Sequence, residues 1–112
     1  MSVGDVTPKI LYQGALSTAV TALYTPAANM RAQVIEIWID NQNTATQRYI
    51  DIHAGGTAVT NRLTHKIPCP ADQGTVISDA KIVLAPSVPL AMKQDTGTDC
   101  IVTIFGYEEQ IA

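Results

Sequence analysis

Charged residues are scarce in this chain of 112 residues, of which they make up 15%. There are seven Lys and Arg against ten Asp and Glu, and the formal net charge is −3. The basic residues stand singly along the sequence, so no cluster is available to bind a phosphate backbone. We therefore expect no nucleic-acid partner. A surface with so little charge also suggests that another protein covers part of it.

Long hydrophobic runs are absent too. No stretch approaches the ~20 apolar residues that a membrane-spanning helix needs. The opening residues, MSVGDVTPKI, lack the basic start and the apolar run of a signal peptide. We therefore expect no membrane partner and a reducing cytoplasm, where Cys69 and Cys100 remain thiols. Both cysteines are expected to act as small buried hydrophobes.

Patterns typical of catalytic or metal sites are missing as well. His53 and His65 are the only histidines, and Asp51 shares a strand face with His53, but no third ligand follows from the spacing. No serine has the Gly-x-Ser-x-Gly context of a nucleophile elbow. Glu108 and Glu109 are adjacent, so on a strand they would point to opposite faces. We expect no enzyme activity, no metal and no cofactor.

The residues that are abundant favour strands. Thr, Ala, Val and Ile are frequent, and β-branched side chains suit a pleated sheet better than a helix. Eight or nine short strands at roughly ten-residue spacing indicate an all-β, two-sheet antiparallel sandwich that is jelly-roll-like. We expect one such domain over residues 10–112. Residues 1–9 should form a short extended N-terminal arm or first edge segment, since Gly4 and Pro8 disfavour a helix.

The clearest alternation lies in VIEIWIDNQNTATQRYIDIHA, residues 34–54. Ile35, Ile37 and Ile39 share one face of a first strand, and Ile50 and Ile52 share one face of a second. The connector NQNTATQ is rich in Asn and Thr, which favour turns. This arrangement predicts an antiparallel hairpin whose isoleucines face the core.

Trp38 is the only tryptophan, and the alternation places it on the face that points away from the core. In a hairpin, Tyr49 or its neighbours would lie across from it, and polar residues such as Glu36 and Arg48 would surround the pair. An apolar centre with a polar rim is typical of a protein interface, so these four residues are the candidate interface. Two further roles for Trp38 stay open: it could pack beneath a loop of its own domain, or it could form the floor of a sugar site.

Two segments, LYTPAANMRAQVIEIWIDNQNTATQRYIDIHAGG and IPCPADQGTVISDAKIVLAPSVPLAMK, carry a family resemblance. Their order of strands, proline-flanked turns and Gly-Gly turn resembles that of small structural proteins of tailed bacteriophages. Within that group the chain is similar to the short jelly-roll capsid decoration (cement) proteins. The resemblance covers about residues 10–108.

The resemblance implies a jelly roll that binds the outside of a phage head and stabilises contacts between major capsid protein subunits. It also implies a homodimer, located on the virion surface and made in the bacterial host cytoplasm. It carries over no site residue. Two alternatives remain: another phage structural module (fibre base, tail or baseplate), or a carbohydrate-binding β-sandwich, for which one Trp, one Phe and four Tyr are a small supply of aromatics.

Overall fold

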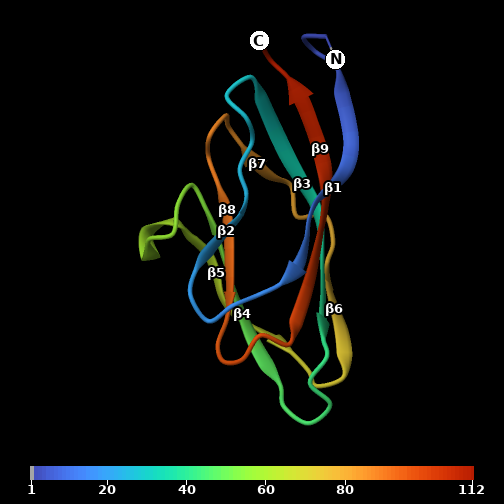
Figure 1. Cartoon of the computed structure of the whole chain (residues 1–112), viewed down its shortest axis with the longest axis vertical. Helices are drawn as coiled ribbons and strands as arrows, with labels where there is room; N and C mark the ends of the chain where they lie inside the picture. The colour runs from blue at the N-terminus through green and yellow to red at the C-terminus, as the bar shows by residue number, and fades with distance from the viewer. Residues whose placement is uncertain (1) are drawn as a thin grey trace.

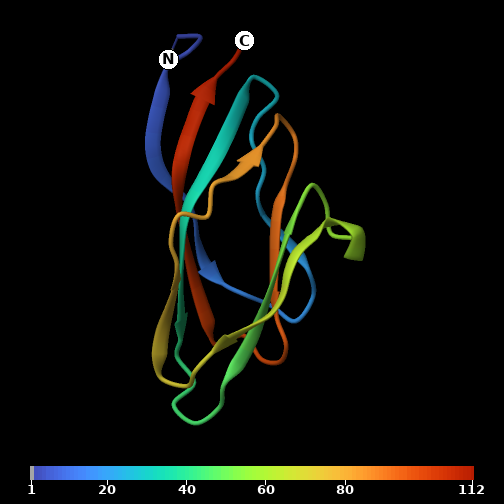
Figure 2. The ribbon, with the colours of Figure 1, turned by 180° about the vertical axis from the view of Figure 1, so that it is seen from behind.

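The computed structural model describes residues 2–112, which form two antiparallel β-sheets packed face to face (Figures 1 and 2). Strands account for 59% of the residues and helix for 3%. The described residues contain one short 3-10 helix, η1 (Val59–Asn61), and no helix long and apolar enough to cross a bilayer. The nine strands are β1 (Val6–Ala15), β2 (Thr21–Tyr24), β3 (Met30–Asn41), β4 (Arg48–Ala54), β5 (Arg62–Cys69), β6 (Gln73–Ile77), β7 (Ile82–Leu84), β8 (Leu90–Gln94) and β9 (Cys100–Gln110).

The order of the strands is that of a jelly roll. The five-stranded sheet runs β1-β9-β3-β6, with β7 also paired to β3, and the four-stranded sheet runs β2-β8-β4-β5. The first and the last strand lie side by side, and the second lies beside the eighth, as in the double Greek key of eight-stranded jelly rolls. The predicted all-β, two-sheet sandwich is therefore confirmed.

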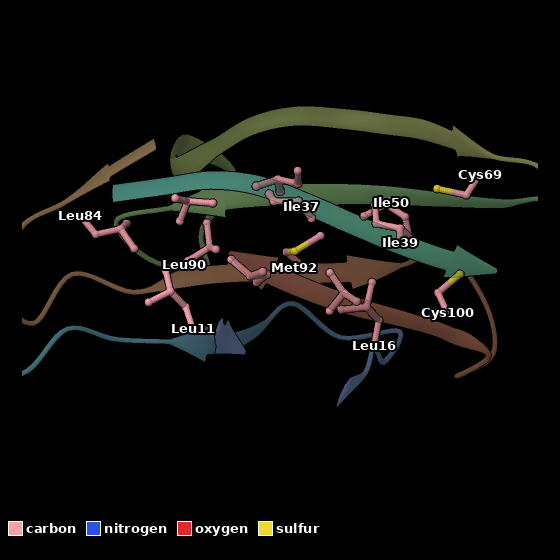
Figure 3. Close-up of a cluster of buried hydrophobic side chains, with 14 of the residues drawn as sticks. Leu11, Leu16, Ile37, Ile39, Ile50, Cys69, Leu84, Leu90, Met92 and Cys100 are labelled. Atoms are coloured by element: carbon pink, nitrogen blue, oxygen red, sulfur yellow. The ribbon is translucent and has the colours of Figure 1, made fainter. Parts of the chain in front are cut away.

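The core fills the space between the sheets. Figure 3 shows Ile37 and Ile39 of β3 in one layer with Ile50 of β4, and these side chains are at most 2% exposed. Each fully buried aliphatic side chain of this size is worth about 1.5–3 kcal/mol relative to exposure. The other large apolar side chains that are fully buried are Leu16, Val34, Leu84, Leu90, Met92, Val102 and Ile104.

Both cysteines are free thiols buried at one end of this core (Figure 3). Each is fully buried, as expected of a small hydrophobe. Burial raises the pKa of Cys100 to about 12 and also raises the pKa of Cys69. Both side chains are therefore neutral packing groups at physiological pH.

The predicted hairpin between residues 34 and 54 is wrong, because its two strands lie in different sheets. β3 pairs with β6, β7 and β9, whereas β4 pairs with β5 and β8. The connector crosses the edge of the sandwich next to Asn41, whose fully buried amide donates to the carbonyls of Thr46 and Cys69, at 3.0 Å each. Asn41 Oδ1 accepts the backbone N–H of Asn43 at 3.0 Å. These bonds satisfy backbone groups of the connector and of the end of β5.

The prediction that Ile35 faces the core is corrected by a β-bulge. Val34 pairs with Gly106 and Glu36 with Phe105, so Ile35 is an extra residue without a partner on β9. The inward row therefore runs through Val34 before the bulge and through Ile37 after it, and Ile35 is only partly buried.

Part of the predicted N-terminal arm belongs to the sandwich. Val6–Lys9 begin β1 and pair with residues Glu109 to Gly106 of β9, so this segment is the edge of the five-stranded sheet. Before it, Gly4 donates its N–H to the Gln110 carbonyl at 2.7 Å. Residue 1 lies outside the described residues.

Candidate functional site

The outer face of the five-stranded sheet carries several exposed apolar side chains. Cross-strand register places Trp38 of β3 between Val76 of β6 and Thr103 of β9, and places Ile10 of β1 beside Phe105 of β9. Residues paired in this way project from the same side of a sheet. We call this surface the apolar face and define it by Val6, Ile10, Trp38, Val76, Val83, Phe105 and Tyr107, each at least 36% exposed.

Trp38 is held in place by its neighbours in the sheet. Its ring meets Phe105 edge to face, with centroids 6.2 Å apart and planes at 74°. Its indole Nε1 donates to Glu36 Oε1 at 2.9 Å, yet half of the residue remains exposed. Both contacts come from the sheet rather than from a covering loop. The arrangement leaves a fixed aromatic surface exposed to solvent.

Three shallow hollows follow the apolar face. Their volumes are ≈ 330, 360 and 290 Å³, and they are lined in turn by Val83 and Tyr107, by Ile10 and Phe105, and by Trp38 and Val76. Beside the first hollow, Arg31 Nη2 and Glu109 Oε1 form an ion pair at 2.9 Å. The face is therefore broad and largely apolar, with this ion pair beside its first hollow and the carboxylates of Glu36 and Asp40 beside the other two.

The structure brings two of the four predicted interface residues together. Glu36 and Trp38 are neighbours on the apolar face, but Tyr49 and Arg48 belong to β4 in the opposite sheet. The predicted aromatic pair of Trp38 and Tyr49 is therefore wrong, because the chain changes sheets between them. Phe105 takes the place that we assigned to Tyr49.

Arg48 has a local role at the end of the sandwich. Its guanidinium donates to Asp99 through Nε at 3.0 Å and through Nη2 at 2.9 Å. These bonds hold the pKa of the Asp99 carboxyl far below its usual range, and the same contact raises the pKa of Arg48. Asp99 also accepts a bond from the fully buried amide of Gln94 at 2.9 Å. Arg48 is thus a structural ion-pair partner rather than part of the Trp38 surface.

Sequence reasoning missed the contribution of β9 to the apolar face. Phe105 and Tyr107 alternate with the buried Ile104 and Gly106, a strand pattern that placed them outside the core. In the five-stranded sheet β9 lies between β1 and β3. Its contact with Trp38 depends on pairing between strands that are distant in the sequence.

The outer face of the four-stranded sheet holds two buried polar residues. Asp51 Oδ1 lies 2.8 Å from His65 Nδ1 and accepts the Lys66 backbone N–H at 2.9 Å. His53, on the same face as Asp51, is 2% exposed, and its Nδ1 has no hydrogen-bond partner in residues 2–112. In that part of the chain, no three His, Cys, Asp or Glu side chains are grouped to hold a metal ion.

Burial affects Asp51 and His53 differently. For Asp51, burial raises the pKa, but the bonds from Lys66 and His65 outweigh it and hold the pKa below its ordinary value of 3.8. For His53, burial lowers the pKa from 6.5, and the nearby Arg62 and Lys93 lower it further against the opposing effect of Asp51. The folded protein therefore keeps His53 neutral over a pH range where the unfolded chain protonates it.

This difference predicts a pH-dependent stability. Because the folded-state pKa of His53 is depressed, its contribution is fully present above pH 6.5 and is lost as the pH falls below that value. The slope can reach about 1.4 kcal/mol per pH unit for one proton. Urea unfolding between pH 7 and 5 should show this decline, and H53L should flatten it. The pKa values of Asp51 and Glu108 are lowered from 3.8 and 4.5, so these carboxyls affect stability mainly below pH 5. An undiminished slope in H53L between pH 7 and 5 would therefore contradict the assignment.

No protein-family model matches the chain, and neither a curated protein nor a solved structure matches it at a significant level. A function for this chain is therefore inferred from its sequence pattern and from the chemistry of its two outer faces.

Proposed function

We propose that this chain is a capsid decoration protein of a tailed bacteriophage. In this proposal it binds the outside of the assembled head and stabilises contacts between major capsid protein subunits. The resemblance of residues 23–56 and 67–93 to such proteins supports it, and the jelly-roll architecture agrees with that resemblance.

The apolar face is the observation that carries the proposal. Seven exposed apolar side chains on one face of a sheet are typical of an interaction site in a globular domain. Trp38, Phe105 and Tyr107 supply the rigid aromatic groups that dominate protein interfaces, and Glu36 and Arg31 supply a polar edge. A broad face of shallow hollows suits the surface of another protein better than it suits a small molecule. We assign this face to the major capsid protein.

We also propose that two copies associate, as the resemblance implies, through a different element. Within residues 2–112, β1 pairs only with β9, so one side of this ten-residue strand presents backbone groups that no other strand pairs. Edge strands of this kind pair readily with a second chain. The apolar face then remains available to the shell.

The decoration protein would stabilise the head by mass action. A ligand that binds only the assembled, expanded shell stabilises it by RT ln(1 + [L]/Kd) at each site, about 2.7 kcal/mol at 100-fold excess over Kd. Repeated over many sites, moderate contacts resist the pressure of packaged DNA. Such a role requires complementary surfaces and no turnover.

Replacing Trp38 with alanine should weaken binding to expanded, undecorated capsids by at least about tenfold, since buried aromatic anchors contribute ~2 kcal/mol or more. The free energy of unfolding should change little, because half of Trp38 is exposed in the free protein. Co-sedimentation with capsids and urea unfolding measure the two quantities.

L63A is the matched control for this substitution. Leu63 is an apolar residue of β5 that is 55% exposed on the other sheet, so the variant should bind capsids as the unmodified chain does. Equal capsid binding by W38A at unchanged stability would remove the apolar face from the interface. Failure of the unmodified protein to sediment with capsids, with binding to isolated tails or baseplates instead, would replace decoration with another structural role.

A further inference from the structure

A separate hollow of ≈ 490 Å³ lies on the outer face of the four-stranded sheet. Residues of β4, β5 and β8 line it, together with the residue that follows β8: Tyr49, Asp51, His65, Lys66, Lys93 and Asp95. This surface is on the opposite side of the sandwich from the apolar face, as the two sheets in Figures 1 and 2 show. A protein bound to a shell through the apolar face would leave the hollow open to solvent.

The two basic side chains in this hollow differ from the others in the protein. Within residues 2–112, Lys66 and Lys93 form no ion pair, whereas the remaining basic residues each have a carboxylate within 4.0 Å. Five of seven basic residues are thus compensated inside the chain, and the two that are not line the same hollow. Asp51 and Asp95 line the same hollow, but Asp51 already contacts His65 and the Lys66 N–H and lies 3.9 Å from Arg62, so the two ammonium groups remain available to an anionic ligand.

A β-bulge builds the wall that carries Lys66. Ile50 pairs with Ile67 and Ile52 with Thr64, so Asp51 alone faces both His65 and Lys66. The bulge is fixed by the two bonds to Asp51 Oδ1, and Lys66 has a left-handed φ of 56°. A lysine is a costly choice for that backbone conformation, which glycine adopts freely. This conformation sets the bulge, and the bulge places Lys66 at the wall of the hollow.

The other groups define the class of ligand. Tyr49 is 39% exposed and offers an aromatic surface beside the two lysines. Asp95 uses one carboxylate oxygen, Oδ1, to accept the Tyr49 N–H at 3.1 Å, which leaves acceptor capacity for a hydroxyl group of a ligand. Lysine ammonium groups donate to carboxylates, and an aromatic ring packs against the C–H face of a sugar. Phosphate lacks both an apolar face and a set of hydroxyl donors.

We infer that this hollow binds an acidic sugar, with the ring against Tyr49, the carboxylate between Lys66 and Lys93, and hydroxyl groups donating to Asp95. The inference does not depend on the proposed capsid role, since a different face carries that role. An acidic side chain of a neighbouring protein is the competing occupant, and the experiment separates the two.

The test is an NMR titration with glucuronate. Glucose, which has the sugar ring without the carboxylate, and acetate, which has the carboxylate without the ring, are titrated for comparison. Glucuronate should shift the signals of Tyr49 and His65, and it should bind at least about tenfold more tightly than either probe. K93Q and Y49A should each weaken glucuronate binding about tenfold. K66G should weaken it as well while raising stability, because glycine relieves the left-handed backbone. K81Q is the control, because Lys81 is exposed, lies outside the hollow and pairs with Asp79.

Several results would overturn the inference. If acetate binds as tightly as glucuronate, the hollow recognises only the negative charge. If glucose binds as tightly as glucuronate, the carboxylate contributes nothing to binding. Absence of any shift with glucuronate, together with weaker capsid binding by K93Q, would assign the lysines to a protein contact. Unchanged glucuronate affinity in K93Q and Y49A would place the sugar elsewhere.

Discussion

Replacing Gly106 with alanine is expected to destabilise the protein by about 3 kcal/mol or more, a large fraction of the ~5–15 kcal/mol that stabilises a typical domain. Gly106 lies in the central strand β9 and is fully enclosed. A Cβ atom at this position would lie 2.3 Å from the carbonyl oxygen of Gln33 and 2.8 Å from Leu11 Cδ1. The leucine could rotate, but the carbonyl belongs to the backbone of β3 and cannot move without breaking the sheet.

Two bulges explain why the chain is so crowded at this point. On β3 the extra residue follows Val34, the partner of Gly106, and on β1 the register shifts between Ile10 and Tyr12, next to the same part of β9. The irregularities in both neighbouring strands therefore lie beside the same residues of β9, Ile104 to Gly106. Only glycine leaves room at position 106 for both the Gln33 carbonyl of β3 and the Leu11 side chain of β1.

G74A provides the matched control, since Gly74 is also a strand glycine and its Cβ would meet only the Ile39 carbonyl oxygen at 3.8 Å. That variant should be neutral or more stable by about 0.4–1 kcal/mol, because alanine reduces the freedom of the unfolded chain. Urea unfolding and the yield of soluble protein measure both variants. Equal stability of G106A and G74A would mean that β3 can shift away, and that the bulges are not rigid.

The fold could be predicted because its signal is local. Alternation along residues 34–41 and 48–54 identified both strands and the buried faces of Ile37, Ile39, Ile50 and Ile52. The bulge at Ile35 could not be predicted from the alternation. Val34, Ile35 and Ile37 are all apolar, so the pattern does not show whether Val34 or Ile35 faces the core. Gly106 inside an otherwise apolar strand was the available signal of a close backbone approach.

The candidate site was only half predictable, because strand partners are not encoded by proximity in the sequence. Alternation correctly placed Trp38 on the outer face, and it is half exposed there. Its aromatic partner is Phe105, which approaches only when β9 pairs with β3. We assigned Tyr49 to that position because it lies on the next strand along the chain. In a jelly roll, consecutive strands often belong to opposite sheets.

The residue that directs this change of sheet should be sensitive to substitution. Asn41 ends β3, and its buried amide bonds to the carbonyls of Thr46 and Cys69 and to the N–H of Asn43. Leucine has a similar volume but cannot make these bonds, so N41L leaves buried backbone groups without partners. Each such group costs about 1–3 kcal/mol, and we expect a total loss of about 3 kcal/mol or more.

Q42L is the matched control for N41L, because it also replaces a side-chain amide of this segment with leucine. Comparing the two variants separates the loss of the buried Asn41 amide from the effect of a more apolar connector. Gln42 is exposed and its side chain makes only a long 3.4 Å contact with Asp40, so Q42L should alter stability by no more than about 0.5 kcal/mol. N41L should also expose residues 42–47 to proteolysis under native conditions, because the bonds that close this connector are lost. Should N41L and Q42L prove equally stable and equally resistant, packing between the sheets alone would direct the crossing. The buried amide would then be a consequence of the corner rather than its cause.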